Sequence, residues 1–249
     1  MRKYFRWVSL TSLASLASLI SLLVIVLTDK GKTLIALCVV IVLLLAFFTK
    51  LYLVLDNYVS TKYPDGHIGI SNLVYYSTED GNRYVYEVFK HIQCKKPVLT
   101  EYTYGFKWTG TTPPTRVTSQ FQLIDAVVPK PAGEFDEIRM RFKKPLLYNE
   151  VGLVHVVMDL DDHDRESSPH LVTRVTEPMQ LLRWHVQLRH LPATYHKPAE
   201  VLRKRIDAQT SQQYEHLTTV QFAAASRSYE HHIPHPDVGY FYRLVWEKG

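Results

Sequence analysis

The hydrophobic positions of this chain follow one pattern in its first quarter and another in the remainder. Residues 8–27 form a run of 20 without a charge, and a helix of that length spans the ~30 Å hydrocarbon core of a bilayer at ~1.5 Å per residue. A second apolar run covers residues 34–55, where Lys50 is the only charge, and a polar link, Asp29–Lys32, joins the two runs. The pattern predicts an antiparallel transmembrane hairpin over residues 1–56.

From residue 57 onward the period is two, which is typical of half-buried strands. In the clearest case, Leu182, Trp184 and Val186 alternate with polar neighbours. Turn signals rich in Pro, Gly and Asp separate such segments. We expect nine or ten strands in a mainly antiparallel β domain over residues 57–249, either a barrel or a sandwich. The expected strands cover 69–77, 83–92, 102–108, 115–127, 138–143, 151–160, 171–176, 182–188, 217–224 and 240–246.

One segment departs from this alternation. Residues Pro198–Glu215 contain good helix formers around Leu202, with Pro198 at a plausible first turn. The sequence therefore predicts one helix in the β domain.

Basic residues near the apolar runs predict how the protein sits in a membrane. Arg2, Lys3 and Arg6 precede the first run, and Lys30 and Lys32 lie in the link. An excess of Lys and Arg marks the cytoplasmic side, so we expect a multi-pass inner-membrane protein with both termini and the β domain in the cytoplasm. The chain has only 2 cysteines, which agrees with a reducing compartment. A cleaved signal peptide is the alternative for residues 1–27, but its apolar region would be unusually long.

The first apolar run also carries small residues on one helical face. Small residues at four-residue spacing let membrane helices approach closely. This predicted association face serves either packing within the hairpin or a homo-oligomer in the membrane, and the two can coexist. Its members are Thr11, Ala14, Ser15, Ser18 and Ser21.

Charge argues against a nucleic-acid partner. The net charge is +5, but residues 1–56 hold six Lys and Arg against two acidic residues. The remaining 193 residues are nearly balanced, with 23 basic and 22 acidic side chains. The basic character therefore belongs to the membrane flanks, and we expect no binding to DNA or RNA.

Sequence motifs for catalysis are missing, since the chain has no phosphate-binding glycine loop, HExxH, GxSxG or CxxC pair. We expect neither an enzyme nor a cofactor. The acidic segment Asp159–Glu166 lacks the turn glycine of a calcium loop and is interpreted as a connecting loop. A second polar cluster is a weak metal candidate, with an ordinary loop between two strands as the alternative. Its members are His231, His232, His235 and Asp237.

A third region suggests ligand recognition. The aromatic segment Tyr102–Trp108 leads into a hydroxyl-rich loop. Lys107, Thr111 and Arg116 could hold phosphate, and Trp108 could stack on a base. The alternative is an ordinary hairpin whose aromatic side chains belong to the core.

The order of a short N-terminus, a two-helix hairpin and a β-rich domain resembles the two-transmembrane effectors of bacterial antiphage signalling (CBASS and related systems). The resemblance lies in layout and not in a motif. It implies a β domain that senses a cyclic oligonucleotide and transmembrane segments that then oligomerise and disrupt the inner membrane. That is the leading hypothesis. The alternative is a non-enzymatic membrane scaffold whose β domain docks a cytosolic protein, and a third is a membrane-bound enzyme that uses the histidine cluster.

Overall fold

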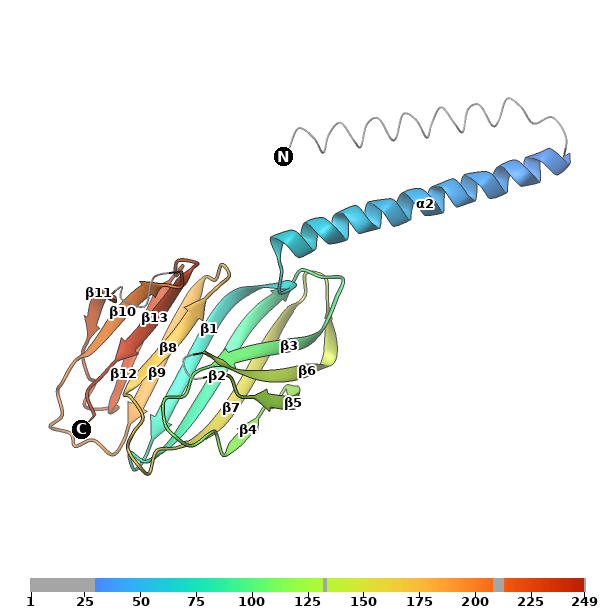
Figure 1. Cartoon of the computed structure of the whole chain (residues 1–249). Helices are drawn as coiled ribbons and strands as arrows, with labels where there is room; N and C mark the ends of the chain where they lie inside the picture. The colour runs from blue at the N-terminus through green and yellow to red at the C-terminus, as the bar shows by residue number, and fades with distance from the viewer. Residues whose placement is uncertain (1–29, 132–133, 208–212, 249) are drawn as a thin grey trace. The chain divides into compact units, whose positions relative to one another are not determined.

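The computed structural model describes residues 30–131, 134–207 and 213–248 (Figure 1). The first predicted helix, residues 8–27, lies outside the described residues, and so does the association face Thr11, Ala14, Ser15, Ser18 and Ser21. The chain divides into an N-terminal unit that ends at Tyr58 and a second unit that begins at Val59.

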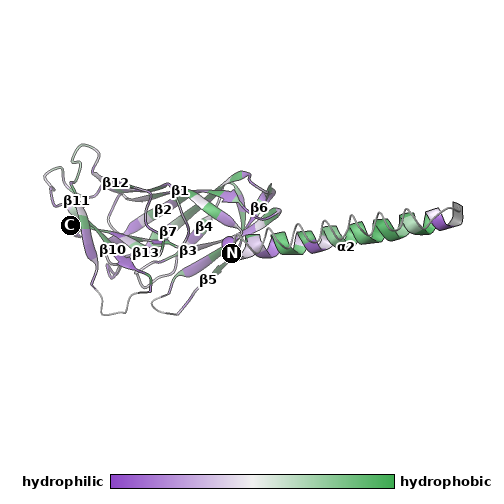
Figure 2. Cartoon of the chain, turned by 90° about the horizontal axis from the view of Figure 1, so that it is seen from above, coloured by the Kyte–Doolittle hydropathy of each residue, from purple (hydrophilic) through white to green (hydrophobic). Residues whose placement is uncertain are grey.

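Helix α2, Lys30–Lys62, confirms a long apolar helix near the N-terminus. Within its segment Lys32–Lys62, a window of 18 residues has a mean hydropathy of 2.9, and the segment is long and apolar enough to cross a membrane. Figure 2 shows hydrophobic residues along most of its length. The helix continues two turns past the predicted end at residue 55. After Gly31 in its first turn, the helix meets no glycine or proline until Pro64, and helical geometry is disfavoured for the residue before a proline.

The second unit is built from strands, which form three sheets with open edges. A six-stranded sheet has the order β12-β9-β1-β2-β7-β4, a four-stranded sheet the order β11-β10-β13-β8, and a three-stranded sheet the order β3-β6-β5. Every pairing is antiparallel except that of β1 with β9. The strands are β1 His67–Thr78, β2 Arg83–Cys94, β3 Val98–Phe106, β4 Arg116–Thr118, β5 Gln122–Val128, β6 Asp136–Leu147, β7 Val151–Asp161, β8 His170–Val175, β9 Leu181–Leu188, β10 Ala199–Arg205, β11 Glu215–Val220, β12 Ser228–Pro234 and β13 Tyr240–Val245.

One face of the six-stranded sheet packs against both smaller sheets. The indole of Trp184 on β9 donates to Thr173 Oγ1 on β8 at 3.1 Å, and Tyr86 on β2 shares a hydrogen bond with Tyr104 on β3 at 3.0 Å. Alternate residues of the central strands, such as Val74 and Val88, are fully buried on this inner face. The open edges and facing sheets make the domain a sandwich, one of the two predicted architectures.

A glutamine side chain takes the place of a neighbouring strand at one edge of the six-stranded sheet. Strand β4 pairs with β7 only at residues 157–159. Further along β7, Gln122 Oε1 accepts from the His155 N–H at 3.0 Å, and its Nε2 donates to the Leu153 carbonyl at 2.7 Å. These are the two backbone groups that a longer β4 would pair, so the side chain satisfies the exposed edge.

Three sequence expectations are corrected. The helix predicted over Pro198–Glu215 is wrong, because its described residues form strand β10 and the start of β11. Strand β10 lies between β11 and β13, and that ladder overrides helix propensity. The single strand predicted over 115–127 is two strands, β4 and β5. The loop expected around His231 is strand β12, so the described part of the chain holds more strands than predicted.

Candidate functional site

The four predicted ligand residues do not converge in the structure. Arg116 is exposed on β4, opposite Asp159. Trp108 is half-buried against the core, where a Cβ on Gly110 would come within 2.6 Å of its indole atoms. The indole is therefore covered by the chain itself instead of lying open for a base.

Lys107 and Thr111 face different neighbours. Lys107 lies beside His170, whose pKa is lowered to about 4, first by burial and then by the charges of Arg243 and Lys107. Thr111 donates a hydrogen bond to the carboxylate of Asp164. A carboxylate at this position disfavours a phosphate by like-charge repulsion.

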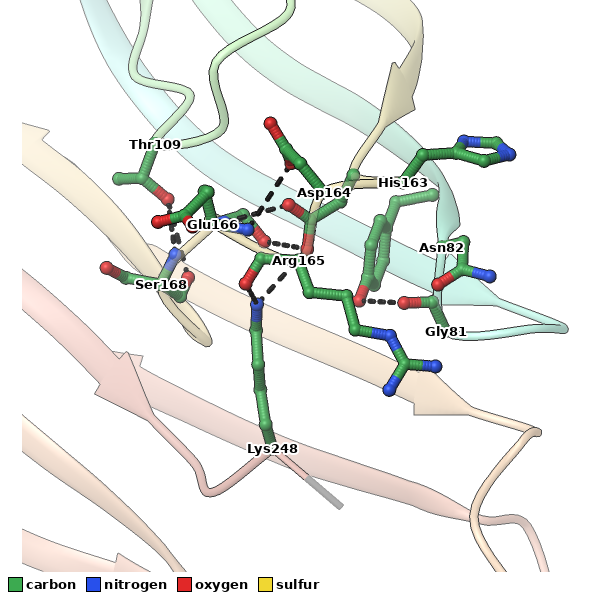
Figure 3. Close-up of polar contacts among 12 residues, drawn as sticks. Gly81, Asn82, Thr109, His163, Asp164, Arg165, Glu166, Ser168 and Lys248 are labelled. Atoms are coloured by element: carbon green, nitrogen blue, oxygen red, sulfur yellow. Dashed lines mark hydrogen bonds and ion pairs between the residues drawn. The ribbon is translucent and has the colours of Figure 1, made fainter.

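The acidic segment covers the last residues of β7, up to Asp161, and then the loop between β7 and β8, whose polar groups are engaged in hydrogen bonds and an ion pair (Figure 3). Asp162 is fully buried and accepts from the backbone N–H of Ser167 at 2.8 Å. Lys248 Nζ lies 3.2 Å from the Asp162 carboxylate and donates to the Arg165 carbonyl at 2.6 Å. Thr109 Oγ1 accepts from the Ser168 N–H at 2.9 Å. The loop is therefore held by the ion pair of Asp162 with Lys248, which follows β13, and by the hydroxyl-rich segment.

The histidine candidates belong to strand β12 and to the loop after it. His231 and His232 are consecutive residues of β12, and the centres of their rings lie 6.3 Å apart. Asp237 is held by Arg203, whose Nη1 lies 2.9 Å from its carboxylate. Among the described residues, no group of three or more His, Cys, Asp or Glu side chains could hold a metal ion.

The structure reveals a different site, which sequence reasoning missed. A cavity of about 570 Å³ lies where β3 of the three-stranded sheet faces β8 of the four-stranded sheet, above β1 and β2. Its floor carries Asn72 from β1 and Lys90 from β2, which are register partners on the inner face of the six-stranded sheet. Glu177, just after β8, and His67, at the start of β1, complete the floor. None of the four predicted ligand residues lines it.

An ion pair lies at the centre of the cavity. Lys90 Nζ is 2.8 Å from Glu177 Oε1, and their side chains are only 14% and 11% exposed. His67 Nε2 lies 3.4 Å from the same oxygen. The Lys90 ammonium also lies 5.6 Å from the centre of the Tyr102 ring. One carboxylate oxygen therefore serves two partners.

Protonation follows from these contacts. Burial alone would raise the pKa of Glu177, but the hydrogen bond from His67 and the charge of Lys90 lower it overall. Burial alone would lower the pKa of Lys90, but Tyr102 and Glu177 raise it overall. Burial also raises the pKa of Tyr102. At neutral pH the floor thus holds an ammonium, a carboxylate and a neutral phenol.

Two acceptors on this floor are left over. Asn72 Oδ1 and Glu177 Oε2 are buried and have no hydrogen-bond partner among the described residues. The two residues are only 5% and 9% exposed. Buried polar atoms are normally paired, and an unpaired one costs about 1–3 kcal/mol. The floor can therefore accept hydrogen bonds from a ligand.

Comparison with known proteins gives no family. No family model and no curated protein match the chain. Among solved structures, the M1 zinc metallopeptidase from Deinococcus radiodurans matches with 9% identity and a TM-score of 0.36, covering 72% of this chain and 42% of the peptidase. The full-length major pilin RrgB from Streptococcus pneumoniae matches with 10% identity and a TM-score of 0.26, covering 73% of this chain and 37% of the pilin. The chain thus spans less than half of either protein, and similarity at this level carries no argument about function.

Proposed function

We propose that this protein is a membrane-anchored recognition module. In this proposal the apolar N-terminal region inserts into a bilayer, and the β sandwich binds a ligand in the inter-sheet cavity without catalysing a reaction of that ligand. The observation that carries the proposal is the pair of unpartnered buried acceptors, Asn72 Oδ1 and Glu177 Oε2, beside an ion pair. A ligand that donates hydrogen bonds to them removes a cost that the unliganded protein bears.

The membrane part of the proposal rests on helix α2, whose length and hydropathy suit a bilayer. The basic flanks of the sequence support an inner-membrane protein with both termini and the β domain in the cytoplasm. Alkaline extraction of bacterial membranes tests insertion, and protease access to a C-terminal tag in spheroplasts tests orientation. Release by alkali would contradict insertion, and a tag digested in intact spheroplasts would contradict the orientation.

Two forms of the proposal differ in the ligand. In the effector form, a cyclic oligonucleotide binds the cavity and the transmembrane segments oligomerise and disrupt the membrane. In the scaffold form, the domain docks a cytosolic protein. The charges that line the cavity favour the scaffold form, because a polyphosphate prefers an excess of cations and the cations here are matched by carboxylates. The lining side chains are Lys90, Lys96 and Arg174 against Asp65, Glu101 and Glu177.

Thermal unfolding of the full chain in detergent, with a panel of cyclic di-, tri- and tetranucleotides, separates the two forms. A ligand at 100 times its dissociation constant adds about 2.7 kcal/mol to the free energy of unfolding, which raises the Tm by several degrees. A shift with one compound that disappears in Lys90→Met and persists in the exposed control Lys144→Met would show nucleotide binding in the cavity, which the effector form requires and the scaffold form does not. No shift with any compound would rule that form out.

A further inference from the structure

The cavity is lined by strand edges and not by a strand face. Side chains of a strand alternate between its two faces, so a cavity over one face meets every second residue. Here all eight consecutive residues of the segment 98–105 line the cavity, and on the opposite side so do residues 172–174 and 176–177. Consecutive residues line a space when it runs along the backbone. The cavity therefore follows the edges of β3 and β8.

Both edges lack a neighbouring strand. Strand β3 pairs with β6 and ends the three-stranded sheet, and β8 pairs with β13 and ends the four-stranded sheet. Among the described strands, neither has a partner on its other side. An edge of this kind presents backbone N–H and C=O groups that can pair with an added strand.

The two edges run in opposite directions across the cavity. Tyr102, in the middle of β3, lies with Lys90 near Glu177, beyond the end of β8. Thr109, beyond the end of β3, bonds to Ser168, which precedes β8. One strand placed between them would be antiparallel to one edge and parallel to the other. It would join the two small sheets into one layer opposite the six-stranded sheet.

The floor restricts which side chain such a strand can point inward. The unpartnered atoms, Asn72 Oδ1 and Glu177 Oε2, are both acceptors, so the inward side chain has to be a donor. The charge on the floor is already balanced between Lys90 and Glu177. A further buried charge would have no counter-ion and would carry a large desolvation cost. A neutral donor, such as the amide of Gln or Asn, satisfies both conditions.

We infer that the cavity binds an extended peptide segment of a partner protein as an added β-strand, with a neutral hydrogen-bond donor side chain directed at Asn72 and Glu177. This inference rests on the proposed function and names the ligand class for the same cavity. The backbone of the peptide pairs with β3 and β8, and its inward residues alternate between the donor and apolar side chains. The apolar ones pack beside Tyr104 and Met179, which are buried and line the cavity.

Peptide display on the full chain in nanodiscs tests the inference. The library contains heptapeptides with Thr at outward positions and randomised residues at the inward positions 2, 4 and 6. We expect enrichment of Gln or Asn at one inward position and of apolar residues at the others. The best binder is then synthesised unchanged and with its donor residue replaced by Leu. A third set of peptides carries a single backbone N-methyl group, which is moved along the peptide one residue at a time.

Each form has a defined expectation. Loss of one hydrogen bond worth about 1.4 kcal/mol weakens binding tenfold, so the Leu form should bind at least tenfold more weakly. At least one N-methyl form should lose binding, because it removes a backbone donor. In the Asn72→Leu protein, the donor peptide should weaken while the Leu peptide does not. Since peptides are altered as well as the protein, a misfolded variant does not leave the inference undecided.

A dye on the rim separates failure of this inference from failure of the proposed function. Val98 is half exposed and lines the cavity, so an environment-sensitive dye on Val98→Cys, with Cys38→Ser, reports any occupant. A response to a cyclic nucleotide but to no library peptide would overturn the peptide inference and leave the recognition module standing. Silence toward both would overturn both. Peptide binding that survives every N-methylation would overturn strand addition.

Discussion

Replacing the buried ion pair by apolar side chains should preserve stability and abolish binding. The pair is Lys90 and Glu177, with 2.8 Å between Nζ and Oε1 and little exposure of either side chain. The perturbation is Lys90→Met, Glu177→Leu and the double variant. A pair kept for stability and a pair kept for binding respond differently to this series.

The expected magnitudes follow from the burial of the two charges. Removing one partner leaves the other charge buried, which costs roughly 3–5 kcal/mol. Glu177→Leu should be the more damaging change, because it leaves Lys90 with the neutral Tyr102 ring, whereas Lys90→Met leaves Glu177 with His67 at 3.4 Å. Removing both charges at once also removes both desolvation costs. The free energy of unfolding of the double variant should therefore lie between that of the wild type, within about 1 kcal/mol, and a value about 4 kcal/mol higher.

Urea unfolding of the full chain in detergent, followed by tryptophan fluorescence, measures this cycle. The control is a second cycle on the exposed pair Arg141 and Asp125, which are 2.8 Å apart and should show little coupling because solvent screens them. The double cavity variant should also lose the peptide response. If its loss of stability equals the sum of the two single losses, the two charges are not coupled and the reasoning fails. If it keeps full ligand response, the pair does not serve binding.

The other predictions concern the sheet edge, pH and the membrane. Gln122→Leu should cost roughly 2–4 kcal/mol, because it leaves two backbone groups of β7 unpaired; urea midpoints measure this, and a midpoint equal to that of the exposed control Gln120→Leu would contradict the role. The pKa of His170 is lowered to about 4 from a usual 6.5, so the unfolded chain takes up this proton first as pH falls. The free energy of unfolding should therefore fall by about 3 kcal/mol between pH 6.5 and pH 4. His170→Gln should flatten the slope of unfolding free energy against pH, and an unchanged slope would contradict this role of His170. In the effector form, induced expression should depolarise bacteria, and Ser15→Leu with Ser18→Leu should abolish this while the protein stays in the membrane; undiminished depolarisation would count against the association face.

The fold was largely predictable where burial imposes a period. Strands such as β9, with Leu182, Trp184 and Val186 turned inward, were identified because one face meets the core. The segment that became β10 was misassigned, because its consecutive Arg203, Lys204 and Arg205 carry no apolar alternation. Its pairing with β11 and β13 is a long-range interaction that local propensity does not encode. Strand β12 is not predicted, because Pro234 and Pro236 favour a loop over the segment that contains its histidines.

The candidate site was not predicted, because its residues come from distant parts of the chain. Lys90 and Glu177 are 87 positions apart, and only the fold brings the two side chains together. The sequence nevertheless contains a local signal. Along β2 the inward positions are Tyr84, Tyr86, Val88, Lys90 and Ile92, as the register with β1 and β7 shows.

Lys90 is the exception in this series and breaks its pattern, because the other inward side chains of β2 are apolar or aromatic. The same break occurs on β1, where Asn72 precedes Val74 on the inward face. The two breaks are register partners, so the interior of the sheet is polar at one place on two adjacent strands. Burying Asn72 or Lys90 costs free energy that an apolar side chain at the same position would not, so stability of the fold does not explain either residue. A ligand that needs these groups supplies one, and an amphipathic strand with a polar residue at an inward position is therefore a usable sign of a binding site.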